Sequence, residues 1–127
     1  MTIVDPHLMK DTSYTVYNTF KDKDAFVKDK YSNPFEGNCW PGKSSWPDFF
    51  RPEVRATWID MFSLEKYGHS TLNQYVWNDM NEPSVFSGPE ITMPKDNLHG
   101  AFEHREVHNL YGKYMVMSTY EGLLTRG

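Results

Sequence analysis

The residues best suited to chemistry lie in one stretch, residues 77–83, of sequence WNDMNEP. This stretch brings two carboxylates, two amides and an indole directly after residues 72–76, whose β-branched and aromatic side chains predict a strand. Enzymes built on parallel sheets place catalytic groups at the carboxyl ends of strands, where loops converge on a rigid frame. The stretch therefore predicts a functional site, and Asp79 is its leading candidate.

Asp79 and Glu82 compete for the role of working carboxylate. Asp79 could be kept ionised by hydrogen bonds from Asn78, Asn81 or backbone donors and act as nucleophile, base or stabiliser of a cation. Glu82 lies in an Asn-Glu-Pro sequence, which is how many β-glycosidases present an acid/base glutamate. Asp79 with Asn81 could also merely cap the turn, and Glu82 could pair with an arginine. Residue types alone leave these alternatives open.

Three other residues could bind a metal or react. His104 and His108 are four positions apart, so on a helix they would share one face and could chelate a metal. The zinc-protease pattern needs glutamate directly after the first histidine, and Arg105 stands there. We therefore expect a structural, hydrogen-bonding role for the two histidines. Cys39 is the one cysteine, with no second thiol to pair with, and we expect it to be buried.

The composition limits the classes of function. The 127 residues suffice for one modest domain, and a net charge of -4 offers no basic surface to nucleic acid or an anionic membrane. All apolar runs are shorter than the roughly 20 residues that span a bilayer. Aromatic residues make up 16% of the chain and gather in its middle, which predicts a large shared core or stacking platforms for a flat ligand.

Strands and helices are predicted to alternate along the chain. Residues 1–4 and 72–76 predict strands that end at polar residues. Residues 52–68 predict a helix, with proline at its first position, apolar residues on one face and glycine at its end. Residues 103–124 give the longest helical pattern. This order indicates α/β architecture with βαβ units and a parallel sheet.

Residues 10–52 predict a long irregular loop. Proline and glycine recur every few residues from Tyr31 to Pro52, so neither a helical nor a strand period is established. Loops of this length are uncommon unless they are functional or disordered, and the many aromatic residues here argue against disorder. Trp40 and Trp46 are predicted to anchor the loop. Alternatively, the Gly- and Pro-rich setting of Trp40 favours a stacking platform for a sugar.

Residues 77–86 closely resemble the signature of glycoside hydrolase family 31. Other blocks resemble the same family in the family's order: VDPH at 4–7, CWPG at 39–42, WPDF at 46–49 and EHREVHNLYG at 103–112. The resemblance covers nearly the whole chain and implies a (β/α)8 TIM barrel. A complete barrel takes about 250 residues. We therefore expect residues 1–127 to be a fragment of the catalytic barrel domain, with about two strands, their long βα loops and helices.

The resemblance implies a retaining α-glucosidase that hydrolyses terminal α-linked glucose without a metal or other cofactor. By position, Asp79 matches the catalytic nucleophile of the family. The other matched positions are substrate-binding residues and then supporting residues: Trp40, Trp77 and Met80, followed by Glu82 and Asn81. The family's acid/base aspartate belongs to a later block that is absent from residues 1–127. Because one carboxylate cannot run both steps, we expect the isolated chain to be inactive.

Within the family, residues 86–93 and the later helix are most similar to the catalytic subunits of endoplasmic-reticulum α-glucosidases, and the related neutral α-glucosidases share much of this sequence. This similarity implies a glucosylated N-glycan as substrate, a regulatory β subunit for the full-length protein and a place in the endoplasmic-reticulum lumen. No targeting signal is recognisable in this chain. The alternative is a non-catalytic carbohydrate-binding or truncated product of the same family. Extending the reading frame to a second aspartate block would favour the enzyme.

Overall fold

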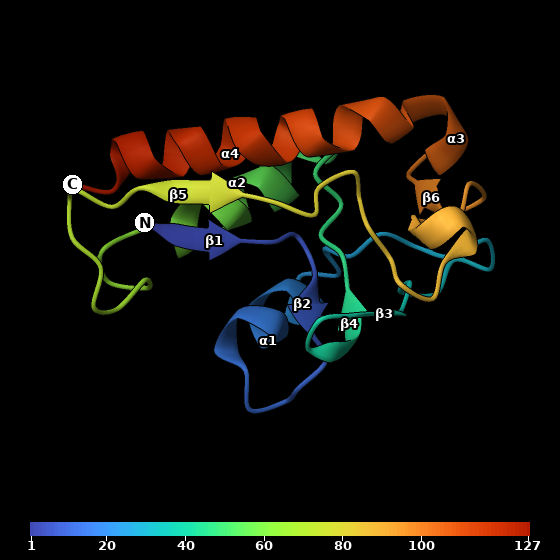
Figure 1. Cartoon of the computed structure of the whole chain (residues 1–127), viewed down its shortest axis with the longest axis horizontal. Helices are drawn as coiled ribbons and strands as arrows, with labels where there is room; N and C mark the ends of the chain where they lie inside the picture. The colour runs from blue at the N-terminus through green and yellow to red at the C-terminus, as the bar shows by residue number, and fades with distance from the viewer.

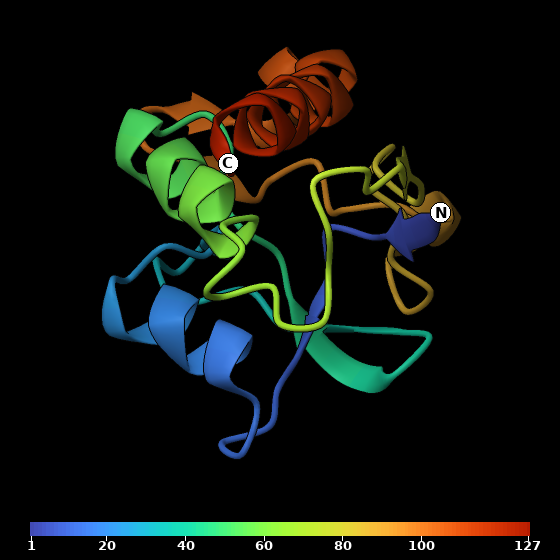
Figure 2. The ribbon, with the colours of Figure 1, turned by 90° about the vertical axis from the view of Figure 1, so that its left-hand side faces the viewer.

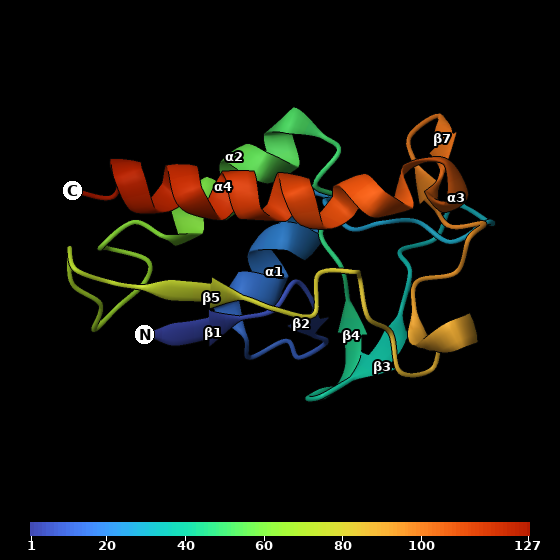
Figure 3. The same cartoon turned by 45° about the horizontal axis from the view of Figure 1, so that its top comes forward.

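Two parallel strands form the frame of the molecule, whose computed structural model describes all 127 residues. β1 (Thr2–Val4) pairs with β5 (Val76–Asn78), and Val4 lies opposite Asn78. The helices α2 (Pro52–Met61) and α4 (Tyr111–Thr125) pack together along one side of these strands (Figures 1 and 3). The predicted parallel pairing of two strands with alternating helices is confirmed.

The chain between β1 and α2 builds a small sheet and one helix. Leu8–Met9 (β2), Gly37–Cys39 (β3) and Gly42–Ser45 (β4) form an antiparallel sheet in the order β2-β4-β3. The helix α1 (Thr15–Asp22) packs on α2, which lies between α1 and α4 (Figure 2). The prediction of an irregular loop over residues 10–52 is therefore wrong for α1, β3 and β4.

These strands and this helix were not predicted from the sequence for two physical reasons. The strands β3 and β4 are three and four residues long, too short to show alternation, and consist mainly of glycine, serine and other polar residues. Gly42 has a φ of +99°, so it makes the hairpin turn that joins these strands. The α1 sequence contains β-branched and aromatic residues of modest helix propensity. It is held as a helix by burial of Tyr17 and Phe20.

Other element boundaries also differ from the predictions. The second strand begins at Val76, because Leu72 and Tyr75 are exposed and lie outside the pairing. α2 ends at Met61 and not at Gly68, because the next N–H groups bond to the carbonyl three residues back, starting with Phe62 N–H to Ile59 O at 3.1 Å.

The predicted helix over residues 103–124 is confirmed in its longer part, α4. Its start is divided into the short helices α3 (His104–Val107) and η2 (His108–Leu110). The remaining elements are η1 (Pro89–Ile91), β6 (Leu98–His99) and β7 (Phe102–Glu103).

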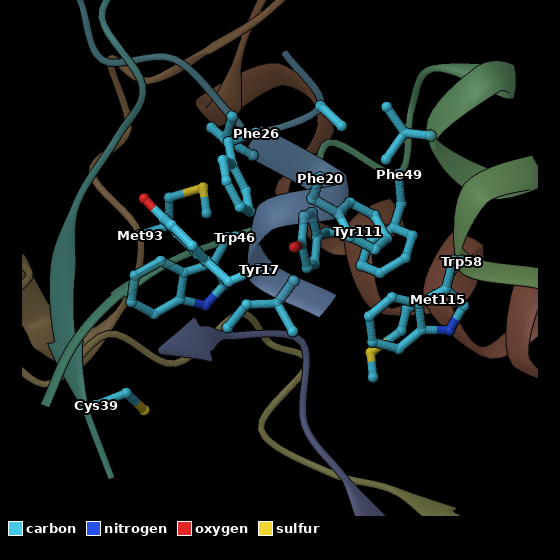
Figure 4. Packing of buried hydrophobic residues seen from close by; sticks show 14 of the residues in the cluster. Tyr17, Phe20, Phe26, Cys39, Trp46, Phe49, Trp58, Met93, Tyr111 and Met115 are labelled. Atoms are coloured by element: carbon cyan, nitrogen blue, oxygen red, sulfur yellow. The ribbon is translucent and has the colours of Figure 1, made fainter. Parts of the chain in front are cut away.

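The core is largely aromatic. Phe49 packs edge-on against Trp58 of α2 and Tyr111 of α4, with ring centroids 5.0 and 5.3 Å apart (Figure 4). Trp46 is fully buried and Cys39 is buried as a free thiol, as predicted. These contacts join the two helices to the segment that precedes α2, so the strands rest on a fixed support. None of the helices is both long and apolar enough to cross a membrane.

Candidate functional site

Asp79 follows the last residue of β5 and is tied to the neighbouring strand. Its N–H donates to Val4 O at 3.2 Å, and Asn78 Nδ2 donates to the same oxygen at 3.4 Å. The side chain of Asp79 is only partly buried, so a ligand can reach it. The Asp79 carboxylate is thus carried by a backbone that two paired strands hold in place.

One face of the strand pair is open. Ile3 and Trp77 lie opposite each other and are 53% and 49% exposed, whereas Val4 points the other way and packs against the core. Because side chains alternate along a strand, Asp5 and Asp79 continue the face of Ile3 and Trp77. The two strands therefore deliver two carboxyl groups to the same side. Sequence reasoning noted a polar residue at the end of the first strand but did not place it beside Asp79.

The loop after Asp79 is held in an unusual conformation. Met80 has a φ of +60°, a left-handed value that is uncommon for a residue with a side chain. Its carbonyl accepts a hydrogen bond from Ser84 N–H at 3.0 Å, and its side chain packs against the core. Glu82 is exposed and accepts from Ser84 Oγ at 3.0 Å. Ser84, and no arginine, is the hydrogen-bonding partner of Glu82.

The two side-chain amides of residues 77–83 donate hydrogen bonds to backbone carbonyls of other elements. Asn78 Nδ2 donates to β1, and Asn81 Nδ2 donates to Gly112 O, at the start of α4, at 3.4 Å. The two amides are therefore not the donors to Asp79 that the sequence suggested as one possibility beside backbone groups. Each amide instead links residues 77–83 to a neighbouring element by a hydrogen bond.

Gly112 is the point at which α4 touches the loop. A Cβ atom at this position would lie 2.6 Å from Asn81 O. We expect Gly112→Ala to lower the free energy of unfolding by about 1–3 kcal/mol through overpacking, although alanine favours helix by about 1 kcal/mol. Urea unfolding of the protein at its full natural length measures this. Gly68→Ala is the matched control, since open space surrounds Gly68. A Gly112→Ala variant more stable than the control would contradict the contact.

Trp40 is presented to solvent. It is 72% exposed and meets Phe86 edge-on, with centroids 5.0 Å apart. The prediction that Trp40 anchors the loop is wrong, because Trp46 does so alone, and the platform alternative is favoured. Phe86 was missed by sequence reasoning; its only signal was its position close behind residues 77–83. Its N–H donates to Asn38 O at 2.8 Å, which ties its loop to β3.

A chain of hydrogen bonds links four ionisable side chains away from Asp79. Asp48 Oδ1 lies 2.8 Å from His99 Nδ1, His99 Nε2 lies 2.8 Å from His104 Nδ1, and His104 Nε2 lies 2.6 Å from His108 Nδ1. Burial, with the neighbouring His99 and His108, lowers the pKa of His104 to about 3. The predicted hydrogen-bonding role of His104 and His108 is confirmed. Their shared bond uses ring nitrogens that a metal would need, and no cluster in the chain is arranged as a metal site.

Burial dominates the electrostatics of the groups around Asp5. Burial, followed by the charges of Asp79 and Glu82, raises the pKa of Asp5. Burial lowers the pKa of His7 and is the main cause of the raised pKa of the Cys39 thiol. A hollow of about 720 Å³, lined mostly by apolar side chains, opens beside Asp5 and His7. Burial therefore disfavours the charged forms of the carboxyl group, the histidine and the thiol.

The family model for the glycosyl hydrolases family 31 TIM-barrel domain matches residues 1–127. The chain belongs to glycoside hydrolase family 31. A probable glucan 1,3-alpha-glucosidase of Oryza sativa subsp. japonica is 54% identical over 128 residues, which cover 100% of this chain and 14% of the relative. This family 31 chain therefore spans about one seventh of the length of that relative.

Solved structures of similar proteins also support the membership of this family. The Glc1Man2-bound glucosidase II alpha subunit superposes with a TM-score of 0.95 at 50% identity, covering 98% of this chain and 14% of that chain. The ER glucosidase II complex of catalytic subunit and regulatory-subunit binding domain gives 0.95 at 51% identity, with the same coverage of 98% and 14%. The predicted membership of family 31, the similarity to the glucosidase II alpha subunit and the partial TIM barrel are confirmed.

Proposed function

We propose that this chain is part of the catalytic barrel domain of a retaining α-glucosidase and that Asp79 is the nucleophile. The observation that carries the proposal is the position of Asp79, at the carboxyl end of a parallel strand, on the open face and fastened to β1. Family 31 membership over residues 1–127 supports the reaction class. Residues 1–127 would contribute this strand pair and its loops to the barrel.

The proposed reaction has two steps. Asp79 attacks the anomeric carbon of an α-glucoside to form a glycosyl ester, while a second carboxyl group protonates the departing oxygen. The same second group then removes a proton from water, which hydrolyses the ester. That group would stand about 5–5.5 Å from Asp79 and come from another part of the barrel. The contribution of this chain is the nucleophile and one wall of the glucose site.

The binding roles follow from exposure and contacts. Trp40, packed edge-on against Phe86, offers an exposed aromatic surface for the C–H face of a sugar. Trp77 and Met80 flank Asp79 in sequence, and the half-exposed Trp77 shares its face. Glu82 and Asn81 support the loop through Ser84 and Gly112, respectively.

The finer assignment concerns substrate, partner and compartment. We infer a glucosylated N-glycan as substrate, a regulatory β subunit as partner and the lumen of the endoplasmic reticulum as location. Their support is similarity alone: a relative at 50% identity has Glc1Man2 bound, and another at 51% is the catalytic subunit of an ER heterodimer.

A mechanism-based label tests the nucleophile. The protein at its full natural length is incubated with an activated 5-fluoro-glucosyl fluoride, whose fluorine at C5 destabilises the oxocarbenium-like transition state and traps the ester. Peptide mass spectrometry should find the label on Asp79, and prior incubation with a competing α-glucoside should reduce it. A label on Glu82 would support the glycosidase function but refute the assignment of Asp79 as the nucleophile.

The second candidate function, carbohydrate binding without hydrolysis, is favoured by the exposed pair of Trp40 and Phe86, which needs no catalytic carboxylate. It predicts no label at all, together with sugar binding that Trp40→Ala abolishes. The same two measurements, labelling and binding, therefore separate the two functions.

A further inference from the structure

The loop of residues 83–93, which carries Phe86, is closed on itself. Thr92 Oγ1 donates to Pro83 O at 2.8 Å, which joins the two ends of the loop. Within the loop, Gly88 packs against the returning chain, since a Cβ atom at this position would lie 1.9 Å from Thr92 O. The loop is therefore compact, and a contact that displaces one part of it also displaces Phe86.

Three successive residues of this loop contact two successive residues of β3. The fully buried Val85 packs on Gly37, where an added Cβ atom would lie 2.7 Å from Val85 Cγ1. Phe86 N–H donates to Asn38 O at 2.8 Å, and Asn38 N–H donates to Ser87 Oγ at 2.9 Å. β3 is the outer strand of its sheet, whose order is β2-β4-β3. The loop therefore supplies hydrogen-bonding partners to the outer edge of β3.

These contacts determine where Phe86 stands relative to Trp40. Trp40 directly follows β3 and lies two residues beyond Asn38. The rings of Phe86 and Trp40 meet edge-on, with centroids 5.0 Å apart and 84° between their planes. Because both backbone groups of Asn38 are bonded to the loop, a shift of the loop along β3 would move the two rings apart.

We propose that Ser87 is a positioning residue, which fixes this loop on β3 and thereby places Phe86 against Trp40. Of the two hydrogen bonds to Asn38, the one from Phe86 joins backbone atoms, whereas the one to Ser87 depends on the side-chain hydroxyl. An aromatic surface binds a sugar better when its rings are already held in place, because ordering a free side chain on binding costs entropy. The proposal rests on the sugar-binding surface that Trp40 forms in the proposed function.

Binding of a thio-linked α-glucosyl disaccharide, which resists hydrolysis, tests the proposal without turnover. In the protein at its full natural length, Ser87→Ala should raise Kd about three- to tenfold, and Ser87→Thr, which keeps the hydroxyl, should stay within about twofold of wild type. Ser63→Ala is the matched control and should leave Kd unchanged, since Ser63 Oγ also accepts a backbone N–H, that of Lys66 at 3.3 Å, but lies just after α2. Equal Kd values for Ser87→Ala and wild type overturn the proposal.

A double-mutant cycle shows whether Ser87 acts through Phe86. Adding Ser87→Ala to Phe86→Ala should change Kd by less than about twofold, because the ring that Ser87 positions is already absent. An equal effect of Ser87→Ala in both backgrounds overturns the positioning role, and so does a Ser87→Ala protein without cooperative urea unfolding, since Ser87 would then support the fold as a whole. A protein that shows the coupling in binding but hydrolyses no aryl α-glucoside would uphold the role of Ser87 and refute the proposed hydrolysis.

Discussion

Asp79→Asn is expected to lower kcat for an aryl α-glucoside by at least about 10⁴-fold. The amide has nearly the shape of the carboxylate but cannot form the glycosyl ester, so the double-displacement route is closed. Because the hydrogen bond from the Asp79 N–H to Val4 O is a backbone contact, the variant should keep its fold. Substrate binding through Trp40 should persist as well. The measurement is kcat together with the affinity for a non-hydrolysable glucoside, in the protein at its full natural length.

A sharper variant is Asp79→Gly with added azide. The small residue leaves room for azide to attack the anomeric carbon from the face that the carboxylate used, and the product from an α-glucoside should be β-glucosyl azide. Asp22→Asn, an exposed carboxylate at the end of α1, is the matched control and should leave kcat unchanged. Hydrolysis by Asp79→Asn at the wild-type rate, or azide rescue that yields the α-anomer, would contradict the assignment of the nucleophile.

The stability of the protein is expected to fall as the pH drops below about 6.5, because of His104. Its pKa in the folded protein is about 3, against an ordinary value of 6.5, so the unfolded chain binds a proton that the buried, neutral ring does not. This contribution to stability is fully present above pH 6.5 and is lost as the pH falls towards 3. Because the unfolded chain binds one more proton than the folded protein in this range, the free energy of unfolding should decrease by about 1.4 kcal/mol per pH unit.

Urea unfolding at pH 7.5, 5.5 and 4.5 measures this slope. His104→Asn removes the titrating group and should flatten the dependence, although it lowers stability at every pH through the lost contacts with His99 and His108. His69→Asn is the matched control: His69 is exposed and has a φ of +64°, which asparagine tolerates. If the control flattened the slope and His104→Asn did not, the explanation would be wrong.

Local signals in the sequence predicted the frame of the fold. Pro52 at the start of α2, the apolar face of α4 and the polar residues at the ends of both strands are readable within a few neighbouring positions. The position of Asp79 directly after the second strand was readable by the same means, whereas the choice of Asp79 over Glu82 came from the resemblance to the family. These features were predictable because each depends on the periodicity or capping of a single element.

The features that were missed depend on contacts between distant residues. Asp5 stands beside Asp79 only because of the strand register, which no local pattern reports. Phe86 meets Trp40 because two loops are joined by a backbone hydrogen bond. The partner of Asp48 lies 51 residues away. The acceptors of the Asn78 and Asn81 amides were missed for the same reason, since each amide donates to a backbone carbonyl on another element.

The chain of hydrogen bonds from Asp48 to His108 has a direction. A carboxylate accepts, so His99 donates from Nδ1 to Asp48, and in a neutral ring its Nε2 atom then accepts from His104 Nδ1. By the same reasoning, the Nε2 atom of a neutral His104 accepts from His108 Nδ1. In this neutral series all three rings carry the hydrogen on Nδ1, and the Nε2 atom of His108 is the outward end. One buried acid thus orients the hydrogen bonds of three successive rings.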